Sequence, residues 1–344
     1  MNYAEIIEDN CKNHSQIAWW PKLAYHHTDI QNAVNILITG LLYGRKDALQ
    51  LGLMKTDNAS RKVIEVTDSE VKESARFFFR PMTPTQYYNE GYKHPQLRYS
   101  QDRYANCPVP VFFTFDLKTI IQEPGTSFTA VTRAGHDPVS QAGLESFAHL
   151  DFQRIYDNSL ENIKTETIYR QAEIAYPSPY PIDNSLVAII CRNEFEQNML
   201  RTMLSRKNKE IYRKYYDKIK VYKKDLFVNN GLYISDCIYT SGKLSIVFSD
   251  SRQKADYVRS MKKKNNIAML DPIHCHITLD WTNNTGKSIL KQKTTAEIDY
   301  EKPESLRYRL QSIPSAKYLA VTIMLEQDLI GYKVQTLQES DTVF

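Results

Sequence analysis

The chain of 344 residues is long enough for one large domain or two medium ones, and its 42% hydrophobic and 24% charged residues exclude an intrinsically disordered protein. The net charge of +4 permits a nucleic-acid partner without requiring one. The five cysteines form no CxxC pair, which argues against a zinc cluster or a disulfide framework. Because the N-terminus lacks a secretory signal and no apolar run could cross a bilayer, we expect no membrane contact and a cytoplasmic location.

The first half of the chain mixes helical and strand patterns. Apolar residues at helical spacing predict a helix within residues 29–42, with Asp29 as its N-cap and Gly40 near its end. Aromatic and β-branched runs predict three buried strands, namely ARFFFRP (75–81), VPVFFTFDL (109–117) and SLVAIICR (185–192).

The pattern changes in the second half. Residues 196–224 combine helical spacing with many lysines, arginines and tyrosines, which predicts one basic helix that contacts nucleic acid or faces water. The short alternating runs beyond it, separated by NNG, SG and NNTG turns, predict a small antiparallel β-sandwich. The sequence therefore predicts an α+β protein with an N-terminal domain (1–195), a linker helix (196–224) and a C-terminal β-sandwich domain (225–344).

Glu173 is a carboxylate within a short apolar strand. In QAEIAY (171–176), strand alternation places Gln171, Glu173 and Ala175 on one face. If that face is covered, the carboxylate needs a polar partner or a ligand, because an unpaired buried charge is costly. A solvated glutamate on an edge strand is the alternative.

Two other segments carry residue types that suit an anionic ligand. In LAYHHTDIQN (23–32), a strand with His26 and His27 leads directly into a helix, whose first turn can bind an anion. Arg76 and Arg80 flank three phenylalanines before a proline-rich turn, where an arginine could clamp a diphosphate. Satisfied core histidines and surface arginines are the alternatives.

Taken together and in this order, three segments resemble the DarT-type DNA ADP-ribosyltransferase toxins of bacterial toxin–antitoxin systems. They are AYHHTDIQNAVNILITGLL (24–42), the segment from DNASRK to YYNEG (57–91) and YRQAEIAYP (169–177). The FRP-x-TPTQ-x-x-NEG loop and the β-rich C-terminal region are closer to the longer, guanine-modifying subtype.

The resemblance implies a fold, a co-substrate and roles for particular residues. The expected fold is a split β-sandwich with helices. The expected reaction is cleavage of NAD as co-substrate, without a metal. Glu173 would be the catalytic carboxylate, and Arg80 or Arg76 would take the arginine role, since this chain has Met82 where the smaller subtype has arginine. The cofactor-binding set is expected to be His26, Thr28, Asn32, Arg45 and Arg76.

The expected acceptor is a base in single-stranded DNA, with guanine favoured and thymine possible. Tyr156, Tyr169 and Arg170 are candidate contacts for an unpaired base and its phosphates. The resemblance further implies a cognate antitoxin hydrolase of the NADAR or macrodomain type, and a role in phage defence.

Two other functions remain open from the sequence. The same fold could modify RNA or protein, because single strands of either sugar stack on aromatic side chains. The chain could also be a non-catalytic nucleic-acid-binding module with a degenerate NAD site.

Overall fold

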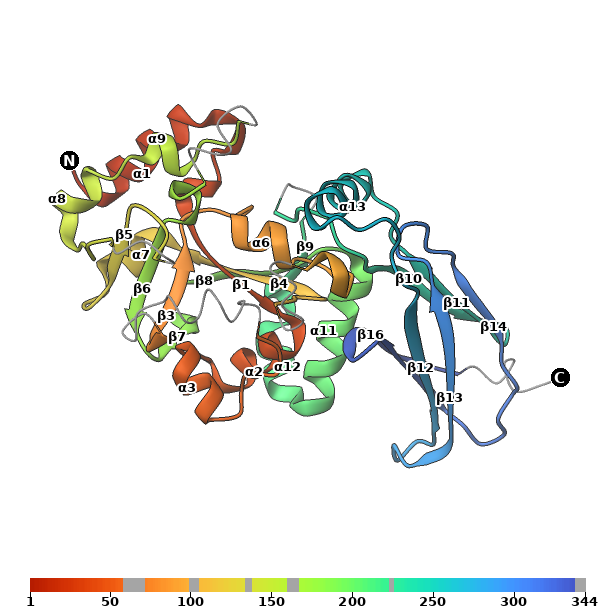
Figure 1. Ribbon diagram of the computed structural model, residues 1–344. Coiled ribbons are helices and arrows are strands. Elements are labelled where there is room, and N and C mark those ends of the chain that lie inside the picture. The colour runs from red at the N-terminus through yellow and green to blue at the C-terminus, as the bar shows by residue number, and fades with distance from the viewer. Residues whose placement is uncertain (58–71, 99–104, 134–137, 160–166, 223–225, 338–344) are drawn as a thin grey trace. The chain divides into compact units, whose positions relative to one another are not determined.

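The computed structural model describes residues 1–57, 72–98, 105–133, 138–159, 167–222 and 226–337 (Figure 1). The chain divides into two compact units, each built from separate segments. Unit 1 comprises residues 1–88, 110–191 and 217–228, and unit 2 comprises residues 89–109, 192–216 and 229–344. The predicted division at residues 195 and 224 stays a prediction.

Unit 1 is built on a seven-stranded sheet in the order β5-β6-β3-β1-β4-β8-β9, in which only the β8–β9 pair is parallel. The strands are β1 (Leu23–Asp29), β3 (Ser74–Phe78), β4 (Pro110–Asp116), β5 (Ser127–Thr129), β6 (Glu173–Pro177), β8 (Leu186–Cys191) and β9 (Ile219–Val221). A small second sheet pairs β2 (Leu41–Leu42) with β7 (Tyr180–Pro181). The three strands predicted from aromatic and β-branched runs are therefore confirmed as β3, β4 and β8.

The centre of this sheet is buried on both faces, which is why its strands are so apolar. Every residue of β4 except Asp116 is buried. On one face Tyr25 and Phe112 form a buried cluster with Ala188, Ile190, Leu226 and Phe227. β1 lies between β3 and β4, so it carries its two histidines through the middle of the unit.

Short helices flank the sheet of unit 1. They are α1 (Tyr3–Asn13), α2 (Ile30–Thr39), α3 (Arg45–Gln50), α6 (Pro84–Asn89), α7 (Leu117–Gln122), α8 (Gly143–Ala148) and α9 (Phe152–Ile155). The helix expected within residues 29–42 is confirmed as α2. Asp29 caps it by accepting a hydrogen bond from the Gln31 backbone N–H, and Gly40 ends it in the left-handed conformation at φ 68°.

The basic segment 196–224 is not the single helix that we expected. It consists of most of α11 (Glu194–Lys207), then α12 (Lys209–Tyr215), a 3₁₀ turn (Tyr216–Lys218) and strand β9. Asn208 breaks the helix because its backbone is extended, at φ −156° and ψ 110°, and its side chain caps the next helix by accepting from the Glu210 and Ile211 N–H groups. The β-branched Ile219 and Val221 then pair with β8.

Unit 2 contains two antiparallel sheets, α11, α12 and the helix α13 (Arg252–Asn265). The three-stranded sheet has the order β10-β11-β14, from Ile234–Thr240, Lys243–Phe248 and Leu306–Arg309. The four-stranded sheet has the order β13-β12-β15-β16, from Ser288–Ile298, Ile273–Thr282, Tyr318–Leu325 and Asp328–Thr336. The α+β class and the antiparallel C-terminal region are thus confirmed.

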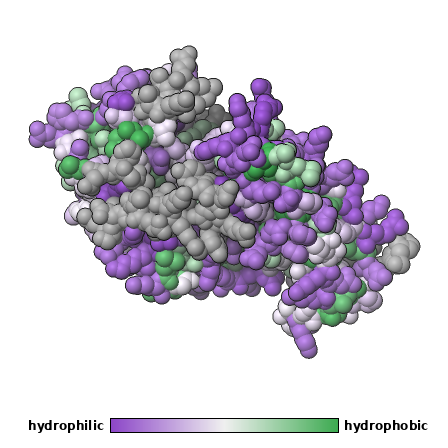
Figure 2. Space-filling view, viewed as in Figure 1, coloured by the Kyte–Doolittle hydropathy of each residue, from purple (hydrophilic) through white to green (hydrophobic). Residues whose placement is uncertain are grey.

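The face seen in Figure 2 is mostly hydrophilic, and its hydrophobic residues lie in scattered patches. Within the described ranges, no helix combines the length and the apolar character that crossing a bilayer requires.

Candidate active site

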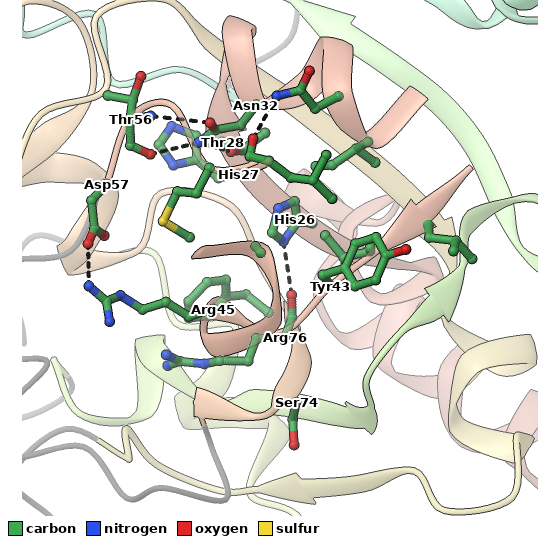
Figure 3. A pocket seen from close by; sticks show the side chains of 18 of the residues that line it. His26, His27, Thr28, Asn32, Tyr43, Arg45, Thr56, Asp57, Ser74 and Arg76 are labelled. Carbon is green, nitrogen blue, oxygen red and sulfur yellow. Dashed lines mark hydrogen bonds and ion pairs between the residues drawn. The ribbon is translucent and has the colours of Figure 1, made fainter. Parts of the chain in front are cut away.

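A pocket in unit 1 brings together residues that are far apart in the sequence (Figure 3). β1, β3 and β6 contribute side chains from the sheet, and α2, α3 and the segment 53–57 supply much of the remaining lining. Six of the predicted site residues line it, namely His26, Thr28, Asn32, Arg45, Arg76 and Glu173. Arg80, Tyr156, Tyr169 and Arg170 are not among the lining residues.

Glu173 is a buried carboxylate that is paired with Arg76. Its side chain is 2% exposed, and its Oε2 accepts hydrogen bonds from Arg76 Nε at 2.8 Å and from Arg76 Nη2 at 2.5 Å. The pairing of β3 with β6 produces this contact, because Phe78 lies opposite Glu173 and Arg76 lies opposite Ala175. Charge-assisted bonds of this kind offset the cost of burying a carboxylate, so Glu173 is held ready in a fixed position.

His26 lies beside this pair as a neutral imidazole. Its Nδ1 is 3.0 Å from the backbone oxygen of Arg76, as the dashed line in Figure 3 shows. A carbonyl oxygen only accepts hydrogen bonds, so Nδ1 carries the proton and Nε2 is an acceptor. Burial lowers the pKa of His26 to about 4, which keeps the ring uncharged at neutral pH.

Asn32 fixes one wall of the pocket. Its Oδ1 accepts from the Lys55 and Thr56 N–H groups at 2.7 and 3.2 Å, and its Nδ2 donates to the Thr56 oxygen at 2.7 Å. Asn35, one turn further along α2, donates to the Leu53 oxygen at 2.6 Å. Hydrogen bonds made by Asn32 and Asn35 of α2 therefore hold the segment 53–57 in place.

Arg45 forms the second ion pair of the pocket, with Asp57. The side chains of Arg45 and Asp57 are 28% and 27% exposed, so both reach solvent or a ligand in the pocket. The guanidinium groups of Arg45 and Arg76 point in the same direction in Figure 3. Two arginines on one side of a pocket are well suited to a diphosphate.

The proline-rich segment after Glu173 positions the helix that carries Arg45. The Ser178 hydroxyl accepts from the Gly44 N–H at 2.9 Å and donates to Asp47 Oδ2 at 2.6 Å. Gly44 cannot be replaced freely, since a Cβ at this position would lie 2.6 Å from the Glu73 carbonyl carbon. The exit of β6 and the start of α3 are thus held together, which links Glu173 to Arg45 through the backbone.

Arg80 lies in the interior rather than in the pocket. It is 1% exposed and donates to the Pro81, Ile155 and Asp157 backbone oxygens and to Asn158 Oδ1, at distances of 2.6–3.1 Å. Its guanidinium also lies over the Trp20 ring, 4.9 Å from the centroid. The expected catalytic contact of Arg80 does not agree with this position, because its guanidinium is committed to holding the segment 155–158.

The three predicted DNA contacts also lie apart from the pocket lining. Tyr156 is 1% exposed and stacks on Phe152, so its ring has no open face for a base and that prediction does not agree with the structure. Arg154 covers the Tyr169 ring at 3.6 Å from the centroid and donates to its hydroxyl. Arg170 bonds to Asp157 and to the Ser159 oxygen. Part of the loop that these residues flank, 160–166, lies outside the described residues.

The sequence interpretation missed several pocket residues, among them Tyr43, Asp57, Thr85, Thr132 and Gln171. Thr85 donates to Gln171 Oε1 at 3.0 Å, which joins the start of α6 to the residue two positions before Glu173. Strand alternation had placed Gln171 on the same face as Glu173 and could have identified it.

Residues of the TPTQYYNEG segment (83–91) mainly make hydrogen bonds and packing contacts outside the pocket. Gln86 accepts from the Met82 N–H and donates to the Leu226 oxygen. Glu90 accepts from the Asn229 N–H, and Gly91 packs closely on Gly231. Of this segment only Thr85 lines the pocket.

Comparisons with known proteins agree on one family. The family model described as "ssDNA thymidine ADP-ribosyltransferase, DarT" matches residues 25–227, more than half of the chain and the segment that contains the whole pocket. The chain belongs to the DarT family. It is therefore an NAD-dependent ADP-ribosyltransferase of the kind that acts on single-stranded DNA.

Solved structures of DarT proteins are also similar to the chain. A Thermus sp. 2.9 DarT in complex with carba-NAD+ is 16% identical, with a TM-score of 0.43, and the match covers 60% of this chain and 98% of that one. The same protein with ADP-ribosylated ssDNA is 15% identical, with a TM-score of 0.45 over 60% and 96%. Thermosipho africanus DarTG with ADP-ribose is 14% identical, with a TM-score of 0.39 over 54% and 47%. No curated protein matches the chain.

Proposed function

We propose that the pocket binds NAD and that Glu173 is the catalytic carboxylate. The observation that carries this proposal is the buried Glu173–Arg76 pair beside a neutral His26, within the segment that matches the family. The C–N bond between ribose and nicotinamide breaks, nicotinamide leaves with the bonding electrons, and a base nitrogen forms the new bond to the same carbon. A fixed carboxylate stabilises the positive charge that builds on the ribose and can accept the proton that the base loses.

Arg76 rather than Arg80 is then the arginine that serves the reaction. Arg76 lines the pocket, is 34% exposed and touches Glu173, whereas Arg80 is buried and bonds to backbone oxygens. Arg45 is the second candidate for the diphosphate, since its side chain reaches the pocket from α3. His26 Nε2 would accept a hydrogen bond from a ribose hydroxyl or the carboxamide N–H.

The proposal also includes the identity of the base that accepts ADP-ribose. The FRP-x-TPTQ-x-x-NEG loop resembles the guanine-modifying subtype, whereas the family description names thymidine. We propose guanine on the strength of that loop, with thymidine as the alternative outcome. Tyr169 and Arg170 remain candidates for contacts with the strand.

The wider biological setting is also a proposal. The resemblance to DarT toxins of toxin–antitoxin systems implies a cognate ADP-ribosyl hydrolase as partner and a role in phage defence, and the similarity to Thermosipho africanus DarTG in complex with ADP-ribose supports the partner. The five cysteines are all buried and form no CxxC pair, which supports a reducing cytoplasm.

Intact-mass analysis of single-stranded oligonucleotides tests the reaction. Purified protein and NAD are incubated with four strands that each lack one base, and with matched RNA and protein pools. A gain of one ADP-ribose on every strand except the one without guanine is expected. A gain only where thymine is present would assign thymidine, and modification of RNA or protein alone would overturn the DNA proposal.

Glu173→Gln identifies the carboxylate. The amide keeps the size of the side chain but loses its charge, so we expect transfer to fall about a thousandfold or more. Glu145→Gln, at an exposed glutamate outside the pocket lining, is the matched control and should keep full activity. Full transfer by Glu173→Gln would refute the assignment.

A further inference from the structure

Strand β13 is a long edge strand of unit 2. It contains 11 residues, from Ser288 to Ile298, and lies at one end of its sheet, beside β12 (Figure 1). Across the described residues β12 is the strand that pairs with it, so the backbone groups on its outer side have no strand partner there. An exposed edge of this length is a template for pairing with another strand.

The exposed face of β13 carries an ordered set of charges. Lys291, Lys293, Thr295 and Glu297 alternate along this face, and all four are exposed. Within the described part of the chain, Lys291, Lys293 and Glu297 make no ion pair. Asp299 continues the same alternation just beyond the end of the strand.

The charges along this face complement those of a second copy of the strand that runs in the opposite direction. In an antiparallel pair of two β13 strands with Thr295 opposite Thr295 of the second copy, Lys293 lies opposite Glu297 and Lys291 lies opposite Asp299. The twofold symmetry repeats both contacts. The two Lys293–Glu297 contacts lie within the strands, and the two Lys291–Asp299 contacts lie at the strand ends, where Asp299 Oδ1 also accepts from the Glu301 and Lys302 N–H groups. Opposite charges directly across two strands stabilise their pairing, whereas like charges weaken it.

The neighbouring registers are less complementary. If Thr294 lies opposite itself, Lys291 meets Glu297 but Ile289 faces Asp299. If Lys293 lies opposite itself, two like charges meet at the centre and Ile289 faces Glu297. A register centred on Ala296 would place Lys293 opposite Asp299 but leave Glu297 opposite Thr295. Of these registers, the one centred on Thr295 is therefore the one in which Lys291, Lys293 and Glu297 all face an opposite charge.

We propose that two copies of this chain associate through antiparallel β13–β13 pairing, centred on Thr295, and so join two four-stranded sheets. A closed twofold contact uses the same surface on both copies, which explains why a single strand carries both halves of the charge pattern. This interaction is independent of the NAD pocket, because all residues involved lie in unit 2.

Cysteine scanning tests the register. Residues opposite each other in an antiparallel pair have Cβ atoms about 4.5–5.5 Å apart, close enough for a disulfide. Single cysteines are placed in turn at positions 293 to 297 of the full chain and oxidised under mild conditions. We expect disulfide-linked dimers to be most abundant for Thr295→Cys. A maximum at another position, or no linked dimer, would overturn the proposal.

Charge exchange tests the contact without cross-linking. Lys293→Glu and Glu297→Lys should each weaken dimerisation in sedimentation equilibrium by about tenfold or more, because each places like charges opposite each other in two symmetric contacts. The double variant K293E/E297K restores opposite charges and should restore the dimer. Lys287→Glu, in the turn before β13, is the matched control. A chain that stays monomeric at all concentrations, or a double variant no better than the single ones, would refute this pairing.

Discussion

The two arginines that flank the phenylalanine run differ in every structural respect that matters for catalysis. Among the described residues, the guanidinium of Arg76 bonds to Glu173, and the side chain remains 34% exposed in the pocket. Arg80 donates to four oxygens and is 1% exposed. The first side chain can contact a ligand and the second cannot do so without breaking the segment that it holds.

Lysine substitutions should separate the two roles. Arg76→Lys keeps the positive charge but cannot hold the Glu173 oxygen through two nitrogens, so we expect kcat/KM to fall about tenfold or more with little change in unfolding free energy. Arg80→Lys leaves buried oxygens unpaired and should lower the unfolding free energy by about 2–4 kcal/mol. Where Arg80→Lys is still folded, at low temperature, its transfer rate should be close to that of the unsubstituted chain. A folded but inactive Arg80→Lys would contradict this division.

His26 should make stability depend on pH. Burial lowers its pKa to about 4 in the folded chain, against about 6.5 when unfolded. As the pH falls below 6.5 the unfolded chain takes up the proton first, so the stabilisation by neutral His26 is present above pH 6.5 and is lost progressively down to about pH 4. Between pH 7 and pH 5 we expect this loss to amount to about 1–2 kcal/mol.

Urea unfolding at pH 7 and pH 5 measures the effect. His26→Asn places an uncharged N–H donor near the position of Nδ1, so its stability should fall less between the two pH values than that of the unsubstituted chain. His149→Asn, at an exposed histidine, controls for histidine removal in general. Equal losses for the His26→Asn variant and the unsubstituted chain would show that His26 is not the group responsible.

Among the elements, α2 does the most to shape the pocket. Its N-cap Asp29, together with Asn32 and Asn35, bonds to the segment 53–57. Side chains at a helix start often cap the first N–H groups, which have no partner within the helix. Here they also supply partners for a loop that has no regular structure.

Removing the hydrogen bonds between Asn32 and the segment 53–57 should affect both stability and NAD binding. Asn32→Ala removes three hydrogen bonds to the backbone of residues 55–56, and we expect it to cost about 1–3 kcal/mol of unfolding free energy and to raise KM for NAD. Asn32→Asp keeps one acceptor but places a second acceptor oxygen against the Thr56 oxygen, so it should not restore stability or KM. Asn184→Ala removes an exposed asparagine as a control. An unchanged KM in the Asn32→Ala variant would show that the segment 53–57 does not contact NAD.

The helices and strands also show which features can be predicted from local sequence patterns. Caps and apolar spacing located α2, and aromatic runs located β3, β4 and β8, because these features act over a few residues. The pattern could not tell that Asn208 divides the basic segment, since lysine and tyrosine are compatible with helix on both sides of it. It also gave Tyr156 and Arg80 exposed roles, because burial of a tyrosine or an arginine depends on distant partners, here His14 for Tyr156 and Trp20 for Arg80.

For Glu173, by contrast, the local sequence was informative because a charged residue interrupts an apolar strand. A charge in an apolar strand has to be paired if it is buried, and the structure supplies the pair from β3, about a hundred residues away in the chain. The sequence predicted the need for a partner, while only the pairing of β3 with β6 identified Arg76.

On the scale of the whole molecule, the two units alternate along the chain. Residues 89–109 belong to unit 2, where Tyr92 bonds to Leu232 through the backbone, the Tyr300 hydroxyl donates to the Tyr92 oxygen, and Arg98 pairs with Asp328. Unit 1 likewise needs Leu226 and Phe227 to complete the cluster around Tyr25.

This alternation sets the order of events during synthesis. A chain leaving the ribosome has made every pocket residue once Glu173 has been added, yet the cluster around Tyr25 must wait for residues 226 and 227. The segment 89–109 waits longer still, until Asp328 is available to Arg98. Domains that are continuous in sequence fold one after another as they emerge, and this chain cannot do so. If the protein modifies DNA as we propose, a nascent fragment that stops before Leu226 and Phe227 would still lack the packed cluster around Tyr25, so we expect its pocket to be inactive until those residues have been made.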